Sequence, residues 1–130
     1  MILPDTNTIV RYILKDVSNL YVEAEKLFEK VRTGKENIVV LESVLVECVY
    51  VLVKFYKVPR SETSYVLQGF LSYKGVKNVD KDELIESLRM YSASNLDIVD
   101  CILCTKSECY KMPLFSFDND LKNCITKMNQ

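Results

Sequence analysis

Short apolar runs alternate along this chain with longer segments in which apolar residues recur at helical spacing. The short runs Ile2–Leu3, 38–41 and 114–117 predict buried strands, and 76–79 is a weaker strand candidate. Helical spacing predicts a first helix capped by Thr6 or Asn7 and ending near Lys15, and a break follows at 16–19. Further helices are expected over 20–33, 43–56, 61–72, 81–93 and 97–110, with a short last helix at the C-terminus.

Strands that alternate with single helices or helix pairs are typical of an α/β fold. The expected architecture is a mainly parallel sheet, covered by helices on both faces and joined by right-handed crossovers. The chain has 130 residues and contains no repeat, low-complexity tract or linker, so residues 1–130 are expected to form one domain.

Composition narrows the class of protein. Apolar residues make up 48% and charged residues 27%, which is typical of a globular chain. The net charge of −1 gives no sign of a nucleic-acid partner, so such a substrate would need a local basic surface or bound cations. With no membrane-length apolar run and no charged leader, we expect a cytoplasmic protein with no membrane association.

The five cysteines are odd in number and follow no secretion signal, so we expect free, mostly buried thiols and no disulfide framework. Cys101 and Cys104 form a C-x-x-C, but it lies in an apolar helical pattern without a second pair at zinc spacing.

The chain has no histidine, which excludes Ser-His and Cys-His catalysis and any histidine metal site. Acid–base or metal chemistry must therefore come mainly from carboxylates. Asp5 ends the first predicted strand, although it also suits a helix cap. Glu47 lies in a strongly apolar helix, where it is either exposed or, if buried, in need of a charge partner.

Two more positions repeat this pattern of acids at element ends. Asp97 and Asp100 share a helix face at its first turn; capping is the better interpretation for Asp97, and Asp100 is the better candidate for chemistry. Asp118 ends the last predicted strand as Asp5 ends the first. Asp120 follows, and it either contacts one of the metal-binding acids without binding the metal itself or caps a helix.

Two strand-end and two helical carboxylates can converge at one edge of a parallel sheet, but they cannot all ionise there unless cations neutralise them. Oxygen ligands without histidine or paired cysteines favour Mg²⁺ or Mn²⁺ over zinc. Such a site suits hydrolysis of phosphodiesters by metal-activated water.

Four acidic motifs follow one another along the chain. In order, they are Asp5-Thr6-Asn7 after a short strand, Glu47 before Cys-Val-Tyr-Val-Leu, Asp97-Ile-Val-Asp100, and Phe117-Asp118-Asn119-Asp120. Together they resemble a PIN domain, and specifically the small VapC-type toxin ribonucleases. The resemblance implies a three-layer α/β/α fold with a central, mainly parallel sheet of four or five strands. It also implies a Mg²⁺- or Mn²⁺-dependent ribonuclease, a homodimer, and inhibition by a small antitoxin protein.

Carried over by position, the resemblance makes Asp5, Glu47, Asp100 and Asp118 the catalytic and metal-binding acids. Its auxiliary positions are Thr6, Asn7, Asp97, Ser116 and Asp120. The departures are Cys101, where the family usually has Ala, and Ile98, where an aromatic is common; neither belongs to the acidic set, and both bear on the packing behind Asp100.

A basic segment near the expected site contains Lys54, Lys57 and Arg60, which are candidate RNA or antitoxin contacts, with Tyr56 available to stack on a base. An ordinary solvated helix end is the alternative. Arg11 is a further candidate for contact with substrate or an inhibitor's carboxylate, or it pairs with a surface acid.

Two other function classes compete with the ribonuclease. One is a catalytically weak PIN-like module that binds RNA or regulates. The other is a receiver-type phosphoacceptor, which would need a second acid beside Asp5 and a late Lys where Phe117-Asp118 stands.

Overall fold

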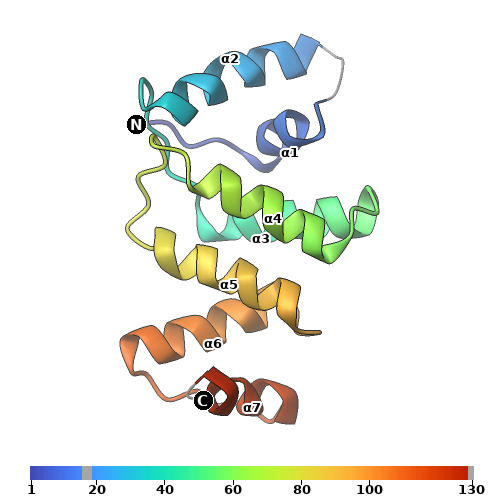
Figure 1. Ribbon diagram of the computed structural model, residues 1–130, viewed down its shortest axis with the longest axis vertical. Helices are drawn as coiled ribbons and strands as arrows, with labels where there is room; N and C mark the ends of the chain where they lie inside the picture. Colours follow the sequence, from blue (N-terminus) through green and yellow to red (C-terminus); the bar gives the residue numbers. More distant parts are fainter. Residues whose placement is uncertain (16–18, 129–130) are drawn as a thin grey trace.

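The computed structural model describes residues 1–15 and 19–128, so most of the predicted break at 16–19 lies outside the described residues. The helices follow one another roughly down the long axis of the molecule, from α2 at one end to α7 at the other (Figure 1). In order, they are α1 (Thr6–Leu14), α2 (Asn19–Thr33), α3 (Glu42–Tyr50), η1 (Val51–Phe55), α4 (Arg60–Leu71), α5 (Lys81–Ala93), α6 (Ile98–Tyr110) and α7 (Asn119–Met128). The seven helices predicted from apolar spacing are confirmed.

The predicted helix over 43–56 is built from two parts. After α3 the backbone widens into η1, a π-helical segment in which Tyr56 N donates to Val51 O at 3.1 Å. Lys57 then takes a left-handed conformation with φ of 58°, and Pro59 leads into α4. The apolar pattern therefore predicted the extent of the helix but not its change of winding.

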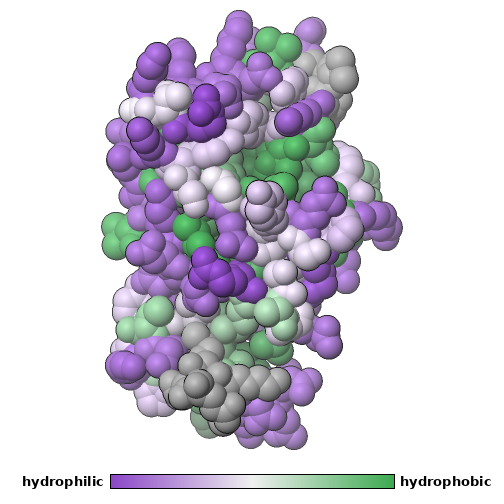
Figure 2. Space-filling view, viewed as in Figure 1, coloured by the Kyte–Doolittle hydropathy of each residue, from purple (hydrophilic) through white to green (hydrophobic). Residues whose placement is uncertain are grey.

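The main core is formed by buried side chains from every helix from α1 through α6. Its largest fully buried side chains include Phe28, Leu45, Leu52, Leu67 and Leu84. A second, smaller cluster joins α6 to α7 through Cys104, Leu121 and Cys124. The face shown in Figure 2 is mostly hydrophilic, with hydrophobic side chains visible between the helices. Burial of the apolar face of each helix is what holds this stack together.

The predicted central sheet is wrong for the residues that the structure describes. Across residues 1–15 and 19–128 there is no strand, and the only β pairing consists of two isolated parallel bridges, Ile2 with Ile38 and Ile38 with Val76. Backbone bonds support each bridge, among them Val39 N to Ile2 O at 3.0 Å and Lys77 N to Ile38 O at 2.9 Å. The α/β/α architecture with four or five strands is thus replaced by a helical stack with three bridged segments.

Local sequence explains why these bridges stay short. Pro4 has no N–H to donate and directly follows the first bridged segment. At the second segment, the Asn78 side chain replaces a neighbouring strand: its Oδ1 accepts from Val40 N at 2.8 Å and its Nδ2 donates to Val40 O at 2.6 Å. A side-chain amide that satisfies both backbone groups ends the ladder there.

The predicted strand over 114–117 is also not formed. This segment stays with α6 and α7, at the opposite end of the molecule from the N-terminus (Figure 1). Leu114 packs on the small cluster of Cys104, Leu121 and Cys124, whereas Phe115 and Phe117 are 86% and 88% exposed. Because a strand needs a neighbour for its N–H and C=O groups, the apolar composition of the run was not sufficient.

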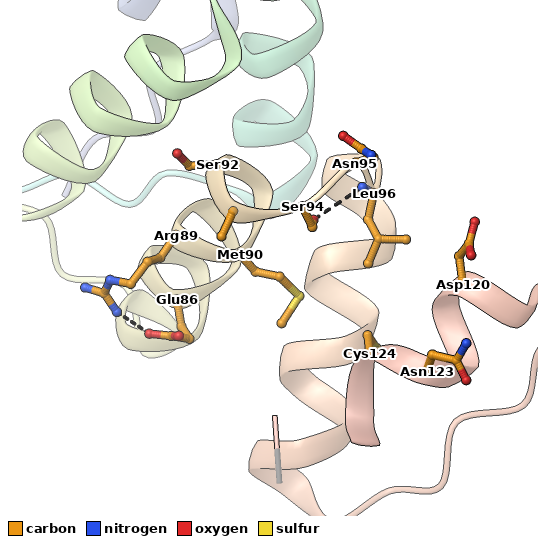
Figure 3. A pocket seen from close by; sticks show the side chains of 11 residues that line it. Glu86, Arg89, Met90, Ser92, Ser94, Asn95, Leu96, Asp120, Asn123 and Cys124 are labelled. Atoms are coloured by element: carbon orange, nitrogen blue, oxygen red, sulfur yellow. Dashed lines mark hydrogen bonds and ion pairs between the residues drawn. The ribbon is translucent and has the colours of Figure 1, made fainter. Parts of the chain in front are cut away.

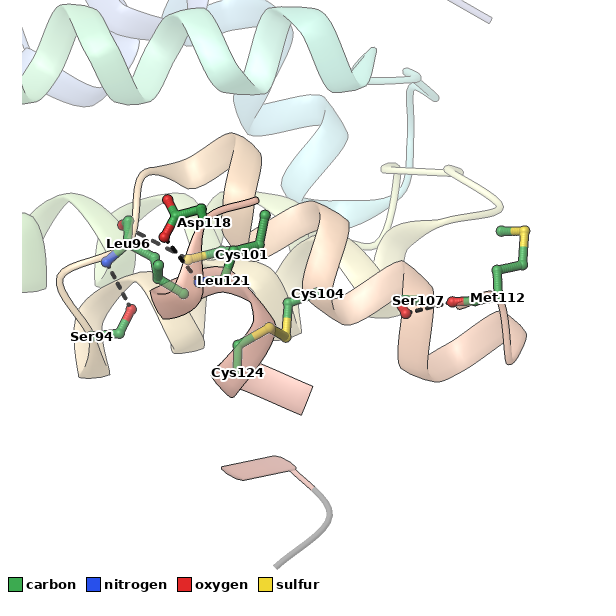
Figure 4. Close-up of a disulfide and its surroundings, with 9 residues drawn as sticks. All are labelled: Ser94, Leu96, Cys101, Cys104, Ser107, Met112, Asp118, Leu121 and Cys124. Carbon is green, nitrogen blue, oxygen red and sulfur yellow. Dashed lines mark hydrogen bonds between the residues drawn. A yellow bond between two sulfur atoms is a disulfide. The ribbon is translucent and has the colours of Figure 1, made fainter. Parts of the chain in front are cut away.

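The expectation of free thiols is wrong for one pair of cysteines. Cys104 on α6 and Cys124 on α7 form a disulfide, with their Cα atoms 6.4 Å apart (Figure 4). Cys48 and Cys101 are free and buried as expected, and Cys109 is free and exposed. Among the described residues no helix combines the length and apolar character needed to cross a membrane.

Candidate active site

Asp5 stands where the N-terminal bridged segment turns into α1. It occupies the N-cap position with extended backbone (φ −91°, ψ 172°), and its Oδ1 accepts a hydrogen bond from Thr8 N at 3.0 Å. Thr8 Oγ1 in turn donates to Asp5 O at 3.0 Å. One carboxylate oxygen of Asp5 therefore serves as the helix cap, in the place where Thr6 or Asn7 was expected to do so, and the side chain is exposed to solvent.

Glu47 lies on the exposed side of α3, while its neighbour Cys48 is fully buried. The pKa of the Cys48 thiol is raised to about 12, chiefly by burial and then by the negative charges of Glu47 and Asp5. Asp5, which caps α1, and Glu47 on α3 thus both act on this thiol, and α1 and α3 are in contact.

Asp97 and Asp100 lie at the start of α6. Asp97 holds the N-cap position as predicted, but its side chain makes no capping hydrogen bond. Asp100 is in the first turn and partly buried, and its pKa is raised by burial first and then by the charges of Asp97 and Asp118. Three of the predicted acids are therefore close enough to repel one another.

Asp118 caps the start of α7. Its Oδ1 accepts from Asp120 N at 2.9 Å and from Leu121 N at 3.4 Å, as Figure 4 shows for Leu121. Ser116 Oγ accepts from Asp118 N at 2.9 Å, which holds the turn before the helix. Asp120 is exposed in the first turn of α7, so Ser116 supports Asp118 through its backbone and Asp120 remains open to solvent.

The other auxiliary positions lie around α1. Thr6 is buried, whereas Asn7 is exposed. Asn7 and Arg11 line a hollow of about 310 Å³ between α1 and α2, on the outer side of the helix that Asp5 caps.

The predicted basic contacts separate into two kinds. Lys54 and Lys57 are exposed at the end of η1, beside the Phe55 and Tyr56 rings, whose centroids are 4.9 Å apart in an edge-to-face arrangement. The Arg60 side chain instead turns inward, where its Nη2 donates to the carbonyl oxygens of three residues at the end of α5 and in the following loop.

The larger cavity, of about 810 Å³, lies between the end of α5, the α5–α6 loop and α7 (Figure 3). Asn95 and Leu96 line it beside Asp97, and Asp120 and Asn123 line it beside Asp118. Among the predicted site acids, Asp120 is the one whose side chain is part of this cavity's lining.

The predicted acids fall into two groups by the side chain on which they act: Asp5 and Glu47 each act on the Cys48 thiol, and Asp97 and Asp118 each act on Asp100. Within residues 1–15 and 19–128, no three Asp, Glu, Cys or His side chains are placed to hold one metal ion together. The donor chemistry nevertheless fits a hard cation, because Mg²⁺ commonly binds one or two carboxylates and keeps several waters. The pKa of Asp100 is raised by burial first and then by the charges of Asp97 and Asp118, and a bound cation would offset the repulsion from those two charges.

Sequence reasoning missed Lys106 on α6, which pairs with Glu42 at 2.8 Å and with Asp80 at 3.5 Å and so ties the starts of α3 and α5 to α6. Arg60 was predicted as an RNA or antitoxin contact, with a solvated helix end as the alternative. The sequence placed it in the break before a helix that begins at residue 61, whereas in the structure it is the first residue of α4.

The family model of the PIN domain matches residues 2–124, which include all four predicted acids, and the chain belongs to this family. PIN domains are generally metal-dependent nucleases that act on RNA or DNA. No match was found among curated proteins or among solved structures. The family is expected to have an α/β fold, and the described residues depart from it by keeping only the two bridges.

Proposed function

We propose that this protein is a Mg²⁺- or Mn²⁺-dependent endoribonuclease, of the kind that acts as the toxin of a type II toxin–antitoxin pair. One observation of the site supports the proposal most. The carboxyl group of Asp100 is partly buried, and its pKa is raised by burial first and then by the charges of Asp97 and Asp118. Like charges near a partly buried carboxylate are unfavourable unless a cation joins them, and a metal-dependent nuclease of this family requires such a cation.

The proposed metal ligands are Asp5, Glu47, Asp100 and Asp118. When bound, a divalent cation supplies an acidified water and neutralises charge on the phosphate. The chain's own part is to hold two of these carboxylates in place at helix starts. Asp5 accepts a hydrogen bond from the backbone N–H of Thr8, and Asp118 accepts one from that of Asp120.

The proposed RNA contacts are Lys54 and Lys57, with Tyr56 offering a face on which a base can stack. Both lysines are exposed and lie beside two aromatic rings that are themselves exposed. Cations interleaved with aromatic rings are the combination that binds single-stranded nucleic acid. Arg11 and the hollow it lines are proposed as a contact for substrate or for an acidic inhibitor segment.

The proposed localisation, oligomeric state and inhibitor rest on the resemblance to VapC-type toxins. We propose a cytoplasmic homodimer that is held inactive by a small antitoxin protein.

The test is incubation of the purified full chain with total RNA, with and without Mg²⁺ or Mn²⁺, and with a matched single-stranded DNA substrate. Asp5→Asn is the decisive variant, because Asn caps a helix as well as Asp does and should keep the fold. We expect loss of cleavage with EDTA and a fall of about 100-fold or more in Asp5→Asn. Glu62→Gln, an exposed acid in the first turn of α4, is the matched control and should cleave as the wild type does.

Full cleavage by a folded Asp5→Asn protein would refute the proposed metal chemistry. Cleavage of DNA but not RNA would keep the nuclease and refute the ribonuclease.

A second candidate function is tested by the same experiment. The acids form two groups, and no three of them in the described part of the chain are placed around one ion, which favours a catalytically weak PIN-like module that binds RNA or regulates. Binding of RNA in the presence of Mn²⁺ without any turnover is the result that would select this alternative.

A further inference from the structure

Arg60 makes an unusual set of contacts at the junction of three helices. It is the first residue of α4, and its Nη2 donates to Tyr91 O at 2.8 Å, to Ser94 O at 3.0 Å and to Leu96 O at 2.7 Å. Its guanidinium carbon also lies 3.6 Å from the centre of the Tyr91 ring. A single side chain therefore holds the last turn of α5 and the loop that follows it.

These carbonyl groups are ones that the helix cannot satisfy by itself. The last carbonyls of a helix have no partner within it, and a cation near them is favourable. Ser94 ends α5 in an extended conformation, and its Oγ accepts from Leu96 N at 3.3 Å. The path of residues 94–96 is thus fixed by Arg60, by this local bond and by the Cys101 thiol on α6, whose Sγ donates to Leu96 O at 3.9 Å (Figure 4).

The same loop determines where α6 begins. Asp97 follows Leu96 directly and is the N-cap of α6, yet its side chain makes no capping hydrogen bond. The orientation of the first turn therefore depends on the loop before it and not on a cap of its own. Asp100 lies in that turn, within the group that it forms with Asp97 and Asp118.

We infer that Arg60 is a positioning residue that aims Asp97 and Asp100 by holding residues 94–96. It acts through backbone carbonyls without bonding to either acid, and this role differs from that of a surface contact for RNA. The inference rests on the proposed metal-dependent nuclease, because it concerns how the acids of that site are oriented. Side chains that orient metal ligands commonly change metal affinity or activity by about 10- to 100-fold when altered.

Arg60→Lys tests the inference, because it keeps the positive charge and removes the planar group that reaches three acceptors. Arg32→Lys is the matched control, since Arg32 on α2 is exposed and pairs with Glu29 one turn away on the same helix. Binding of Mn²⁺ to the full chain is measured by titration calorimetry, below the melting temperature of each variant. Steady-state RNA cleavage then separates kcat from KM.

We expect Arg60→Lys to weaken Mn²⁺ binding about tenfold and to lower kcat more than KM, and Arg32→Lys to stay within about twofold of the wild type. Tyr91→Leu removes the ring under the guanidinium and leaves the arginine in place, so it provides a milder variant if Arg60→Lys does not fold. It should weaken Mn²⁺ binding about two- to threefold.

Three results would overturn the inference, each in a distinguishable way. Unchanged Mn²⁺ affinity with a lowered melting temperature would make Arg60 a purely structural anchor. A rise in KM alone would make it an RNA contact. Absence of Mn²⁺ binding and of RNA cleavage in the wild type would remove the proposed function itself, and this inference with it.

Discussion

Gly75 provides a sharp test of the packing around the two bridges. It is buried between the end of α2 and the segment 36–38, with Gly75 N donating to Val31 O and Ile38 N donating to Gly75 O, both at 2.8 Å. A Cβ at this position would lie 2.1 Å from Glu36 O and 2.8 Å from Val31 O. Both neighbours are backbone atoms, so neither can rotate away.

The cost of Gly75→Ala follows from this geometry. Increasing the separation from 2.1 Å to the 3.0 Å that real Cβ contacts respect needs a shift of 0.9 Å, the difference of the two values. Such overpacking costs about 1–3 kcal/mol, and loss of the bond from Ile38 would add about 1 kcal/mol. At about 4 °C per kcal/mol for a chain of this size, a total of about 2–4 kcal/mol lowers the Tm by roughly 8–16 °C.

Gly69→Ala is the matched control. Gly69 is exposed in α4, and nothing in the described part of the chain lies within 4 Å of the place that a Cβ would take there. Ala favours a helix over Gly, so this variant should gain about 0.5–1 kcal/mol and raise the Tm by roughly 2–4 °C. Thermal unfolding followed by circular dichroism measures both. A Gly75→Ala protein that melts within about 2 °C of the wild type would refute the described packing.

Three further outcomes are expected. Asn78→Leu leaves the N–H and C=O of Val40 without their amide partners, so urea unfolding should show a loss of about 1–3 kcal/mol; no loss would mean that water replaces the amide. The bond between Cys104 and Cys124 closes a loop with a sequence separation of 20, so its reduction should cost about 3 kcal/mol, and the denatured, unreduced chain should titrate three thiols; five thiols would contradict the disulfide. The raised pKa of Asp100 means that the folded chain binds this proton more tightly than the unfolded chain, so stability falls as pH rises from the ordinary value of 3.8 through the folded pKa. Asp100→Asn removes that loss and should raise the Tm by about 1–2 °C at pH 7, with no gain below pH 3.8; an equal gain at both pH values would show that charge is not the cause.

The acids illustrate how far sequence reasoning reaches. The absence of histidine and the position of Asp5, Asp100 and Asp118 at element ends were visible in the sequence, and the structure places all three at helix starts. Whether four acids surround one ion depends on distances between elements. Only the fold supplies these distances, and it gathers the acids into two groups.

The predicted strands failed for a related reason. A run such as 114–117 has a suitable composition for a strand, but a strand exists only where another segment lies beside it. Leu114 instead packs on the cluster that joins α6 to α7.

The sequence by itself determined the helices and the family, because apolar spacing and the order of motifs are local properties of the chain. Tertiary structure alone decided the bridges, the disulfide and the roles of Arg60 and Gly75. Gly69 and Gly75 have no distinguishing mark in the sequence, yet one faces open space and the other faces two backbone carbonyls. Arg60 likewise donates to the carbonyl groups of Tyr91 and Leu96 only because α4 packs beside the end of α5. A side chain acquires partners distant in sequence only through such packing.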